Sequence, residues 1–397
     1  MLDALKTPAP DKILEVAQMF RADDRDGKID LGVGVYKDPD GRTPVMRAVK
    51  AAEKAIWESQ ETKTYTGLAG DPAFAAAMAD MILGPDLVAR TESRRAAIAT
   101  PGGTGAVQKA MELARVAGAE TGTPPRVFLP APTWPNHTAI ARHLGLEVMK
   151  YRYFDAATGG VDADGLVADL GGVREGDLVV VHGCCHNPSG ANPDAALWDR
   201  IAGAIEAAGA PVLVDLAYQG FGDGLEADAA ATRMLAGRLR EVMIAASCSK
   251  NFGIYRERTG LLLVLSDAAG AAQGTMAALN RLNYSFPPDH GARVVQTVLG
   301  DAELRADWEA ELEEVRGDLL GLREALAQAL RERTNSDRFD ALARHRGMFS
   351  RLGLSEAQVV RLREEHAIYM TGDSRINVAG LNARTVPVLA DAIAAVL

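Results

Sequence analysis

A lysine that follows a short apolar run is the residue best placed to act as a nucleophile. Lys250 comes four residues after the run Met243–Ala246. A lysine just past a buried strand can lie in a largely dry site, where desolvation and nearby cations lower its pKa and allow it to form a Schiff base. The serines beside it and Arg258, eight residues on, could bind a phosphate. An isolated lysine of this kind is usually a surface residue at a strand end, so the surrounding groups must decide between the two interpretations.

A carboxylate follows a second apolar run. Asp215 comes directly after Val212–Val214, and ligands of open α/β sheets bind beyond the carboxyl ends of such strands. A buried carboxylate needs a cationic partner. A protonated pyridine nitrogen would be one, and the pairing would turn the pyridine ring into an electron sink. The alternative is the common role of an Asp after a strand, which is to cap the next helix.

A glycine loop and a tryptophan between prolines supply groups that a planar, phosphorylated ligand could use. The loop Thr100–Gly105 leads into the helix-like stretch Ala106–Ala117, whose free N–H groups could bind a phosphate. It is not a Walker loop, because no Gly-Lys-Ser/Thr follows. Trp134 stands between Pro132 and Pro135 and could stack on a planar ring. Taken singly, the loop could be a plain turn and the tryptophan a core residue.

The segment His182–Gly190 adds an amide. His182 and His186, four residues apart, would suggest a zinc site on a helix. The glycines and the proline of the segment make a helix unlikely, so no metal is expected here. Asn187 lies in an Asn-Pro-Ser-Gly turn that follows the run Leu178–Val181 and directs its side chain beyond that strand. The amine, carboxylate, phosphate cradle, amide and aromatic plate together match one cofactor, pyridoxal 5′-phosphate.

Buried strands must position these groups. Short apolar runs bounded by turn or polar residues predict strands at Val127–Leu129, Leu178–Val181, Val212–Val214, Met243–Ala246 and Leu261–Leu265. Helix-like stretches such as Ala106–Ala117 and Ala195–Ala208 lie between them. This alternation predicts an α/β sheet, largely parallel, from about residue 45 to 310.

The C-terminal part has a different pattern. Apolar residues at three- and four-residue intervals predict one long amphipathic helix; they are Leu312, Val315, Leu319, Leu322, Leu326 and Leu330. A coiled coil is the alternative, but the apolar stripe is brief and Gly317 and Gly321 interrupt it. The segment Met348–Leu352, a helix near Ser355–His366 and a strand-like Ile376–Ala379 follow. We expect a smaller α+β domain here, with the N-terminal segment through Lys37 packed against it.

Composition excludes several classes of protein. The chain has 397 residues, 48% hydrophobic and 24% charged, which is typical of a globular protein of two domains and not of a disordered one. Its net charge of -10 argues against nucleic acid or an anionic membrane as the main partner. Three cysteines are too few for a disulfide framework, Pro8 and Pro10 interrupt any signal peptide, and no apolar run approaches the ~20 residues that span a bilayer. These features predict a reducing, cytoplasmic compartment.

The motifs, in this order, resemble the class I aminotransferases, in the branch that acts on aspartate and aromatic amino acids. The segments that carry the resemblance are LGVGVYKDPDGRTPV, KTYTGLAG, TPGGTGA, PTWPNH, HGCCHNPSGANP, DLAYQGFGDGL, SCSKNFGIYRERTG, NYSFPP, RGMFSRLG and GDSRINVAGL. The resemblance covers nearly the whole chain and implies the type I fold of transferases that use pyridoxal 5′-phosphate. It implies an N-terminal arm and part of a small domain at residues 1–44, a large cofactor-binding domain at 45–311, and the rest of the small α+β domain at 312–397.

The resemblance also implies roles for individual residues. Lys250 would hold the cofactor and then move the proton, Asp215 would pair with the pyridinium nitrogen, and His137 would support Asp215. Asn187 and Tyr218 would bond to the phenolic oxygen of the ring, and Trp134 would stack on it. The phosphate would be bound by Gly103, Thr104, Ser247 and Arg258, joined by Tyr65 from the other subunit of a homodimer with shared active sites. Arg375, with Gly34 close by, would bind the α-carboxylate of the substrate, where Trp134 and Asn187 also lie.

The implied substrates are amino acids and 2-oxo acids. Arg281 matches the family arginine that reaches across the dimer to a dicarboxylate side chain, so aspartate, glutamate and 2-oxoglutarate should be accepted. Aspartate enzymes commonly have Asn where this chain has Thr64 and Phe286. The less polar pocket favours phenylalanine, tyrosine and tryptophan as additional donors, with 2-oxoglutarate or oxaloacetate as acceptor in a ping-pong mechanism.

Other functions stay open at this point. The first alternative is an aspartate aminotransferase with minor aromatic activity. A β-lyase or a decarboxylase on the same fold, or a module that only binds the cofactor, would be others. An NAD oxidoreductase is disfavoured, because Gly32-Val33-Gly34 lacks the rest of a dinucleotide fingerprint.

Overall fold

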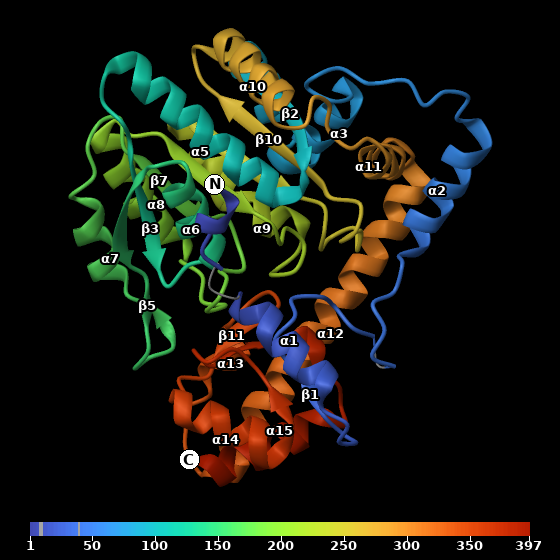
Figure 1. The fold of residues 1–397 in the computed structure, drawn as a ribbon, viewed down its shortest axis with the longest axis vertical. Coiled ribbons are helices and arrows are strands. Elements are labelled where there is room, and N and C mark those ends of the chain that lie inside the picture. The colour runs from blue at the N-terminus through green and yellow to red at the C-terminus, as the bar shows by residue number, and fades with distance from the viewer. Residues whose placement is uncertain (8–10, 39) are drawn as a thin grey trace.

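A seven-stranded mixed sheet forms the centre of the large part of the molecule (Figure 1). The strand order is β2-β10-β9-β8-β7-β3-β4; β10 runs antiparallel to both of its neighbours, and all other pairs are parallel. The strands are β2 (Arg95–Pro101), β3 (Arg126–Ala131), β4 (Glu147–Arg152), β7 (Leu178–His182), β8 (Val212–Leu216), β9 (Val242–Ser247) and β10 (Thr259–Leu265). The structure is a computed structural model that describes residues 1–7, 11–38 and 40–397. Pro8 and Pro10, which argue against a signal peptide, lie outside the described residues.

The central strands are buried on both faces because helices cover the sheet on both sides. Every residue of β7, β8, β9 and β10 is buried, as expected for apolar runs in an α/β sheet. The helices of the large part are α2 (Arg47–Ser59), α3 (Pro72–Leu83), α4 (Pro85–Arg90), α5 (Gly102–Thr121), α6 (Pro135–His143), α7 (Ala163–Leu170), α8 (Ala195–Ala208), α9 (Leu225–Arg238), α10 (Ala269–Asn283) and α11 (His290–Gly300). The predicted α/β class, with a mostly parallel sheet, is confirmed.

The small part is built from both ends of the chain. The parallel pair β1 (Ile29–Asp30) and β12 (Ile368–Tyr369) joins the N-terminal segment to the C-terminal one. β11 (Phe349–Arg351) and β13 (Arg375–Asn377) form an antiparallel pair. The helices here are α1 (Lys12–Ala22), α13 (Ala341–Arg344), α14 (Glu356–His366) and α15 (Thr385–Val396). A third short pair, β5 (Phe154–Asp155) and β6 (Gly160–Val161), reaches down from the large part towards them (Figure 1).

One long helix, α12 (Ala302–Thr334), runs from the large part into the small part (Figure 1). It begins well before Leu312 and continues through Gly317 and Gly321. Trp308 and Leu312 pack into the large core, whereas Leu326, four turns beyond, packs into the small one. The helix therefore contributes residues to both cores. We propose that the domains divide between residues 44 and 45 and between residues 311 and 312. Within the described residues, no helix combines the length and apolarity needed to cross a membrane.

Candidate active site

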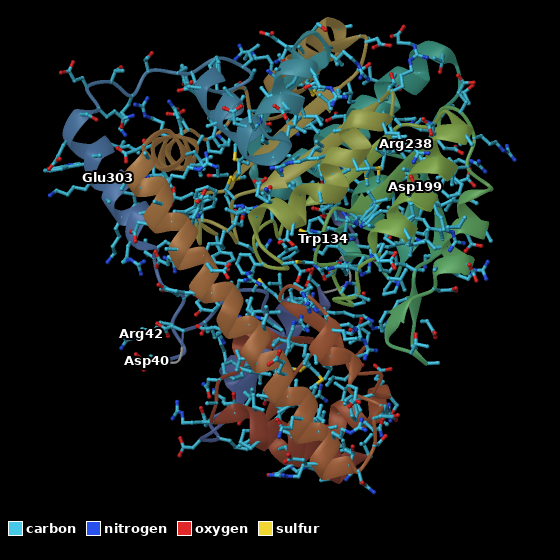
Figure 2. The ribbon with its side chains drawn as sticks, turned by 180° about the vertical axis from the view of Figure 1, so that it is seen from behind. Asp40, Arg42, Trp134, Asp199, Arg238 and Glu303 are labelled. Atoms are coloured by element: carbon cyan, nitrogen blue, oxygen red, sulfur yellow. The ribbon has the colours of Figure 1, made fainter. Side chains whose placement is uncertain are left out.

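The carboxyl ends of neighbouring parallel strands bring the sequence-predicted groups into one pocket. Asp215 lies at the end of β8, opposite His182 of β7, and Lys250 follows the end of β9. The pocket is open to solvent, and its space together with its mouth amounts to about 480 Å³. Its lining includes Gly103, Thr104, Trp134, Asn187, Asp215, Tyr218, Ser247, Lys250 and Arg258. Figure 2 labels Trp134 in the large part, near the end that faces the small part.

Asp215 is a buried carboxylate held by a histidine. Nε2 of His137 donates to Oδ2 of Asp215 at 3.0 Å, and the other ring nitrogen of His137 lies 2.8 Å from the hydroxyl of Thr133. Burial raises the pKa of Asp215, but this hydrogen bond and the nearby His137, His182 and Lys250 outweigh it, so the pKa lies below its ordinary value. Asp215 is therefore ionised and can pair with a cation inside the pocket.

Lys250 offers an amine whose pKa is lowered. Burial is the main cause, the Arg258 guanidinium adds to it, and the Asp215 carboxylate opposes it. The ammonium nitrogen lies 5.1 Å from the centre of the Tyr218 ring. A lysine with a lowered pKa that lines a pocket can serve as a nucleophile and as a proton carrier.

The pocket ends in a set of donors suited to a phosphate. Gly102 and Gly103 open helix α5, whose first N–H groups point out of the helix, and Arg258 lies beside them. A Cβ on Gly103 would stand 2.8 Å from the Cβ of Ser247, and one on Gly102 would stand 2.5 Å from a guanidinium nitrogen of Arg258. Only glycine allows this close approach. Among the described residues Arg258 has no carboxylate partner, so its charge is available to an anion.

Two further side chains, Asn187 and Tyr218, line the pocket and have polar atoms available to bond to a ligand. Asn187 is buried, and its side-chain oxygen has no hydrogen-bond partner among the described residues. Burial raises the pKa of the Tyr218 hydroxyl, which therefore stays protonated and can donate. A buried polar atom without a partner is costly, so the unpaired oxygen indicates that a ligand completes the site. The donor set, the glycine cradle and Asn187 all fit pyridoxal 5′-phosphate.

Arg375 lies next to this pocket, at the junction with the small part. It is 4% exposed; Nη2 donates to the carbonyl of Gly32 at 2.8 Å, and Nε has no partner among the described residues. Its guanidinium carbon lies 4.5 Å from the centre of the Phe349 ring. Gly34 packs on the same ring, where a Cβ would come within 2.7 Å of Cζ of Phe349. A buried guanidinium with free donors is suited to bind a carboxylate.

Tyr65 and Arg281 do not line the pocket. Tyr65 is 80% exposed and stacks on Phe286, with ring centres 4.6 Å apart. The guanidinium carbon of Arg281 lies 5.9 Å from the Phe286 ring. Tyr65 and Arg281 are exposed and the Phe286 ring between them is half-buried, and none of the three is among the residues that line the pocket.

Sequence reasoning did not single out Phe349. The residue belongs to the quoted segment RGMFSRLG, but nothing in its neighbours along the chain shows that its ring lies between Gly34, Tyr218 and Arg375. Thr133, which fixes His137, was missed for the same reason. Contacts between segments far apart in sequence leave no local pattern.

The histidines predicted not to bind metal lie outside any helix. His182 ends β7, and His186 sits in the loop after it with one ring nitrogen 2.7 Å from the hydroxyl of Ser189. Burial lowers the pKa of both rings, to about 3 for His182. Nearby, Cys184 and Cys185 lie close to Asp228, whose carboxylate accepts backbone N–H bonds from Gly220, Gly222 and Asp223. These bonds already satisfy that carboxylate.

Comparison with known proteins places the chain in context. The family of class I and II aminotransferases matches residues 26–393. An aromatic-amino-acid aminotransferase of Paracoccus denitrificans is 60% identical over 99% of both chains. An aspartate aminotransferase of Escherichia coli strain K12 is 42% identical over 98% of this chain and 99% of that one. A crystal structure of an aromatic-amino-acid aminotransferase from Burkholderia pseudomallei, covalently bound to pyridoxal phosphate, superposes with a TM-score of 0.95 at 40% identity, covering 100% of this chain and 99% of the other.

Proposed function

The chain belongs to the family of class I and II aminotransferases, and from this premise we propose that it transaminates aromatic as well as dicarboxylic amino acids. The donors are phenylalanine, tyrosine, tryptophan, aspartate and glutamate, and the acceptors are 2-oxoglutarate and oxaloacetate. The observation that carries the proposal is the single pocket in which Lys250, Asp215 and a phosphate cradle converge. The name of the relative at 60% identity supports the aromatic substrates.

We propose that pyridoxal 5′-phosphate is the cofactor. When bound, it supplies an electron sink that stabilises the negative charge left when the α-proton of an amino acid departs. Asp215, kept ionised by His137, would accept the hydrogen bond of the pyridine nitrogen. Asn187 and Tyr218 would bond to the phenolic oxygen, and Trp134 would cover the ring. Gly103, Thr104, Ser247 and Arg258 would hold the phosphate.

Lys250 carries the proton in this proposal. Its lowered pKa increases the fraction of neutral amine at neutral pH. The nitrogen of Lys250 would accept the proton that leaves the α-carbon of the amino acid and hold it for return within the site. The amino group would pass to the bound cofactor, and water would supply the oxygen of the released 2-oxo acid. Arg375 binds the α-carboxylate, since this group is common to all the substrates and the arginine has free donors.

We further propose that the enzyme is a homodimer that shares its active sites. Three large apolar side chains from nearby segments are strongly exposed: Trp57 at 81%, Tyr65 at 80% and Leu282 at 83%. Burying them against a second copy would remove apolar area from water. Tyr65 would then reach the phosphate and Arg281 the substrate side chain of the partner. The three cysteines are free and buried, which supports a reducing, cytoplasmic compartment.

Arg281 is proposed to serve only the dicarboxylic substrates. An arginine buried against a phenyl ring without an acidic partner would cost several kcal/mol, so it should turn to solvent when an aromatic substrate binds. Arg281→Ala should therefore reduce kcat/KM for aspartate by about 10²-fold, the loss of one buried charge pair, and change the value for phenylalanine much less. Equal losses for both amino acids would contradict this role.

The first experiment is a single half-reaction. Purified protein loaded with pyridoxal 5′-phosphate is mixed with L-phenylalanine without a 2-oxo acid, while its absorption spectrum and the release of phenylpyruvate are followed. We expect the cofactor band to convert and phenylpyruvate to appear in equal amount. Conversion with aspartate but not phenylalanine would favour the aspartate enzyme as the alternative, and the release of ammonia or carbon dioxide would indicate a lyase or a decarboxylase.

Shared active sites can be tested by mixing two defective chains. Lys250→Ala lacks the amine in its own pocket, and Arg281→Ala lacks the arginine that it lends to its partner. In a hybrid dimer, the intact pocket of the Arg281→Ala chain receives Arg281 from the Lys250→Ala chain. Aspartate turnover should then reappear after subunits are exchanged. No recovery, with dimers present by sedimentation, would exclude the shared site.

A further inference from the structure

A second buried arginine, Arg323 on α12, makes a contact set unlike that of Arg375. Its side chain is 0% exposed, and no carboxylate of the described residues forms an ion pair with it. Instead, all three guanidinium nitrogens donate to one short segment, residues 342–350. The acceptors are the carbonyls of Gly347 (2.6 and 3.2 Å), Phe349 (2.8 Å), Leu342 (3.4 Å) and Arg346 (3.5 Å) and the hydroxyl of Ser350 (2.7 Å).

The hydroxyl of Ser350 extends this contact to the large part of the molecule. It accepts from Arg323 and lies 2.9 Å from Nδ1 of His345, while Nε2 of His345 lies 2.7 Å from the carbonyl of Gly159. A carbonyl can only accept, so Nε2 carries the proton and Nδ1 accepts from Ser350. The chain of bonds thus joins α12 to β11 and to the turn between β5 and β6. In Figure 1, α13 and β11 lie together beside α12.

The segment held in this way forms one wall of the substrate site. Phe349, whose carbonyl accepts from Arg323, places its ring 4.5 Å from the guanidinium carbon of Arg375 and edge-on to Tyr218 at 6.2 Å. The segment also packs on the loop that carries Asn187. There, the N–H of Arg346 donates to the carbonyl of Gly190 at 2.9 Å. A Cβ on Gly190 would come within 2.4 Å of the Phe349 carbonyl oxygen, so the two backbones are packed too closely for any side chain at this position.

We propose that Arg323 is a positioning residue that sets the affinity for the substrate α-carboxylate by holding Phe349 against Arg375. It touches neither substrate nor cofactor and acts through the backbone of residues 346–349. Six hydrogen bonds to residues 342–350 fix the geometry of that segment far better than an apolar side chain would, and a displaced Phe349 ring would leave Arg375 misaligned. The inference rests on the proposed function, in which Arg375 binds that carboxylate.

The test separates KM from kcat. Arg323→Lys keeps the charge but loses the fork of donors, and Arg323→Met loses both; Arg331→Met, on the exposed face of the same helix, is the matched control. Steady-state KM and kcat are measured for phenylalanine and for aspartate with cofactor-saturated enzyme. We expect KM to rise about tenfold for both amino acids, since they share the α-carboxylate, with kcat within about threefold of wild type. The control should match wild type.

A double-mutant cycle with Phe349→Leu isolates the proposed route. If Arg323 acts through the Phe349 ring, Arg323→Lys should raise KM by less than about twofold in the Phe349→Leu background. Effects on KM that multiply independently would overturn the inference. Should Arg323→Met not fold, Ser350→Ala removes one hydroxyl only and should raise KM about threefold.

The outcomes distinguish this inference from the function on which it rests. Wild-type enzyme that forms no 2-oxo acid would overturn both. An active wild type combined with Arg323 variants of unchanged KM, or with activity lost only in proportion to the folded fraction, would overturn the positioning role alone.

Discussion

Two buried arginines, about fifty residues apart in sequence, both contact Phe349, Arg323 at its carbonyl and Arg375 at its ring, and they use their donors in opposite ways. Arg323 is 0% exposed and gives every nitrogen to a carbonyl or hydroxyl of residues 342–350. Arg375 is 4% exposed, gives one bond to Gly32 and keeps Nε unpaired among the described residues. Burial lowers the pKa of both guanidinium groups, to about 9 for Arg323.

The difference teaches how to tell a structural charge from a binding one. Burying a charge is costly in either case. In Arg323 the hydrogen bonds within the protein offset that cost, so the group stabilises the fold. For Arg375, the hydrogen bonds within the protein offset only part of the cost of burial, and the carboxylate of a bound ligand would offset the rest. Burial alone would rank the two residues together, whereas the inventory of donors separates them.

The largest expected effect is on activity and belongs to Arg375. Arg375→Lys should lower kcat/KM for phenylalanine by about 10³-fold, because lysine cannot form a bidentate pair with a carboxylate. The midpoint of urea unfolding should change little, since only one hydrogen bond to the protein is lost. Steady-state kinetics and urea unfolding of the same preparation test the two expectations. A clearly lower urea midpoint for Arg375→Lys would show that Arg375, like Arg323, stabilises the fold.

The next effect is on stability and belongs to Arg323. Arg323→Met should lower the free energy of unfolding by about 3 kcal/mol, because it leaves several buried carbonyls without donors. Arg375→Met serves as the matched control, with an expected change below about 1 kcal/mol. Similar losses in the two variants, measured by urea unfolding, would remove the distinction between the two sites.

The Arg323 cluster should also make stability depend on pH. Burial is the main cause that lowers the pKa of His345 to about 4. Between pH 6.5 and 4 the unfolded chain binds a proton that folded His345 does not, so stability falls as the pH falls through this window. The His345 contribution is at most about 3 kcal/mol. The buried His182 and His186 add slopes of the same sign, so the measurement is the difference between wild type and His345→Gln, whose curve should be flatter. Parallel curves would contradict the assignment.

The smallest effect should come from moving the ring without touching either arginine. Gly34→Ala places a Cβ 2.7 Å from Cζ of Phe349 and forces the ring to shift. We expect KM to rise about fivefold for both phenylalanine and aspartate, corresponding to about 1 kcal/mol of overpacking. Gly317→Ala, where a Cβ meets nothing within 4 Å, is the control. The effect should disappear in the Phe349→Leu background; its persistence would show that Gly34 acts on the substrate directly.

Much of the fold could be predicted from the sequence because strands buried on both faces consist of consecutive apolar residues, which form a local pattern. The five runs correspond to β3, β7, β8, β9 and β10, and the stretch 195–208 is α8 with the same limits. Helix α5 starts at Gly102, four residues before the predicted start, because glycines are poor helix formers and conceal the first turn. Within the seven-stranded sheet, the strands β2 and β4, with mixed composition, gave no clear run, and the two-residue strands β1, β5, β6 and β12 are too short to give one.

The site was predictable only in part. Lys250 and Asp215 stand at strand ends, where a local pattern indicates chemistry, and the structure places both in one pocket. Arg375 could be chosen among the arginines only through the family resemblance, because its partners, Gly32 and Phe349, come from distant segments. Tyr65 and Arg281 lie away from the pocket, and the roles that we propose for them require a second copy of the chain.

The spacing of core residues along helix α12 determines how the two cores are oriented relative to each other. Leu319 packs in the large core, Arg323 lies at the junction, and Leu326 and Leu330 pack in the small core, all on one stripe of the helix. With 3.6 residues per turn, each inserted residue would rotate everything beyond it by about 100°. One insertion between Leu319 and Arg323 would therefore turn the whole small part out of phase with the sheet while leaving both sequences of core residues intact. The orientation of Arg375 relative to the pocket of Lys250 and Asp215 therefore depends on the number of residues in α12 between the two cores.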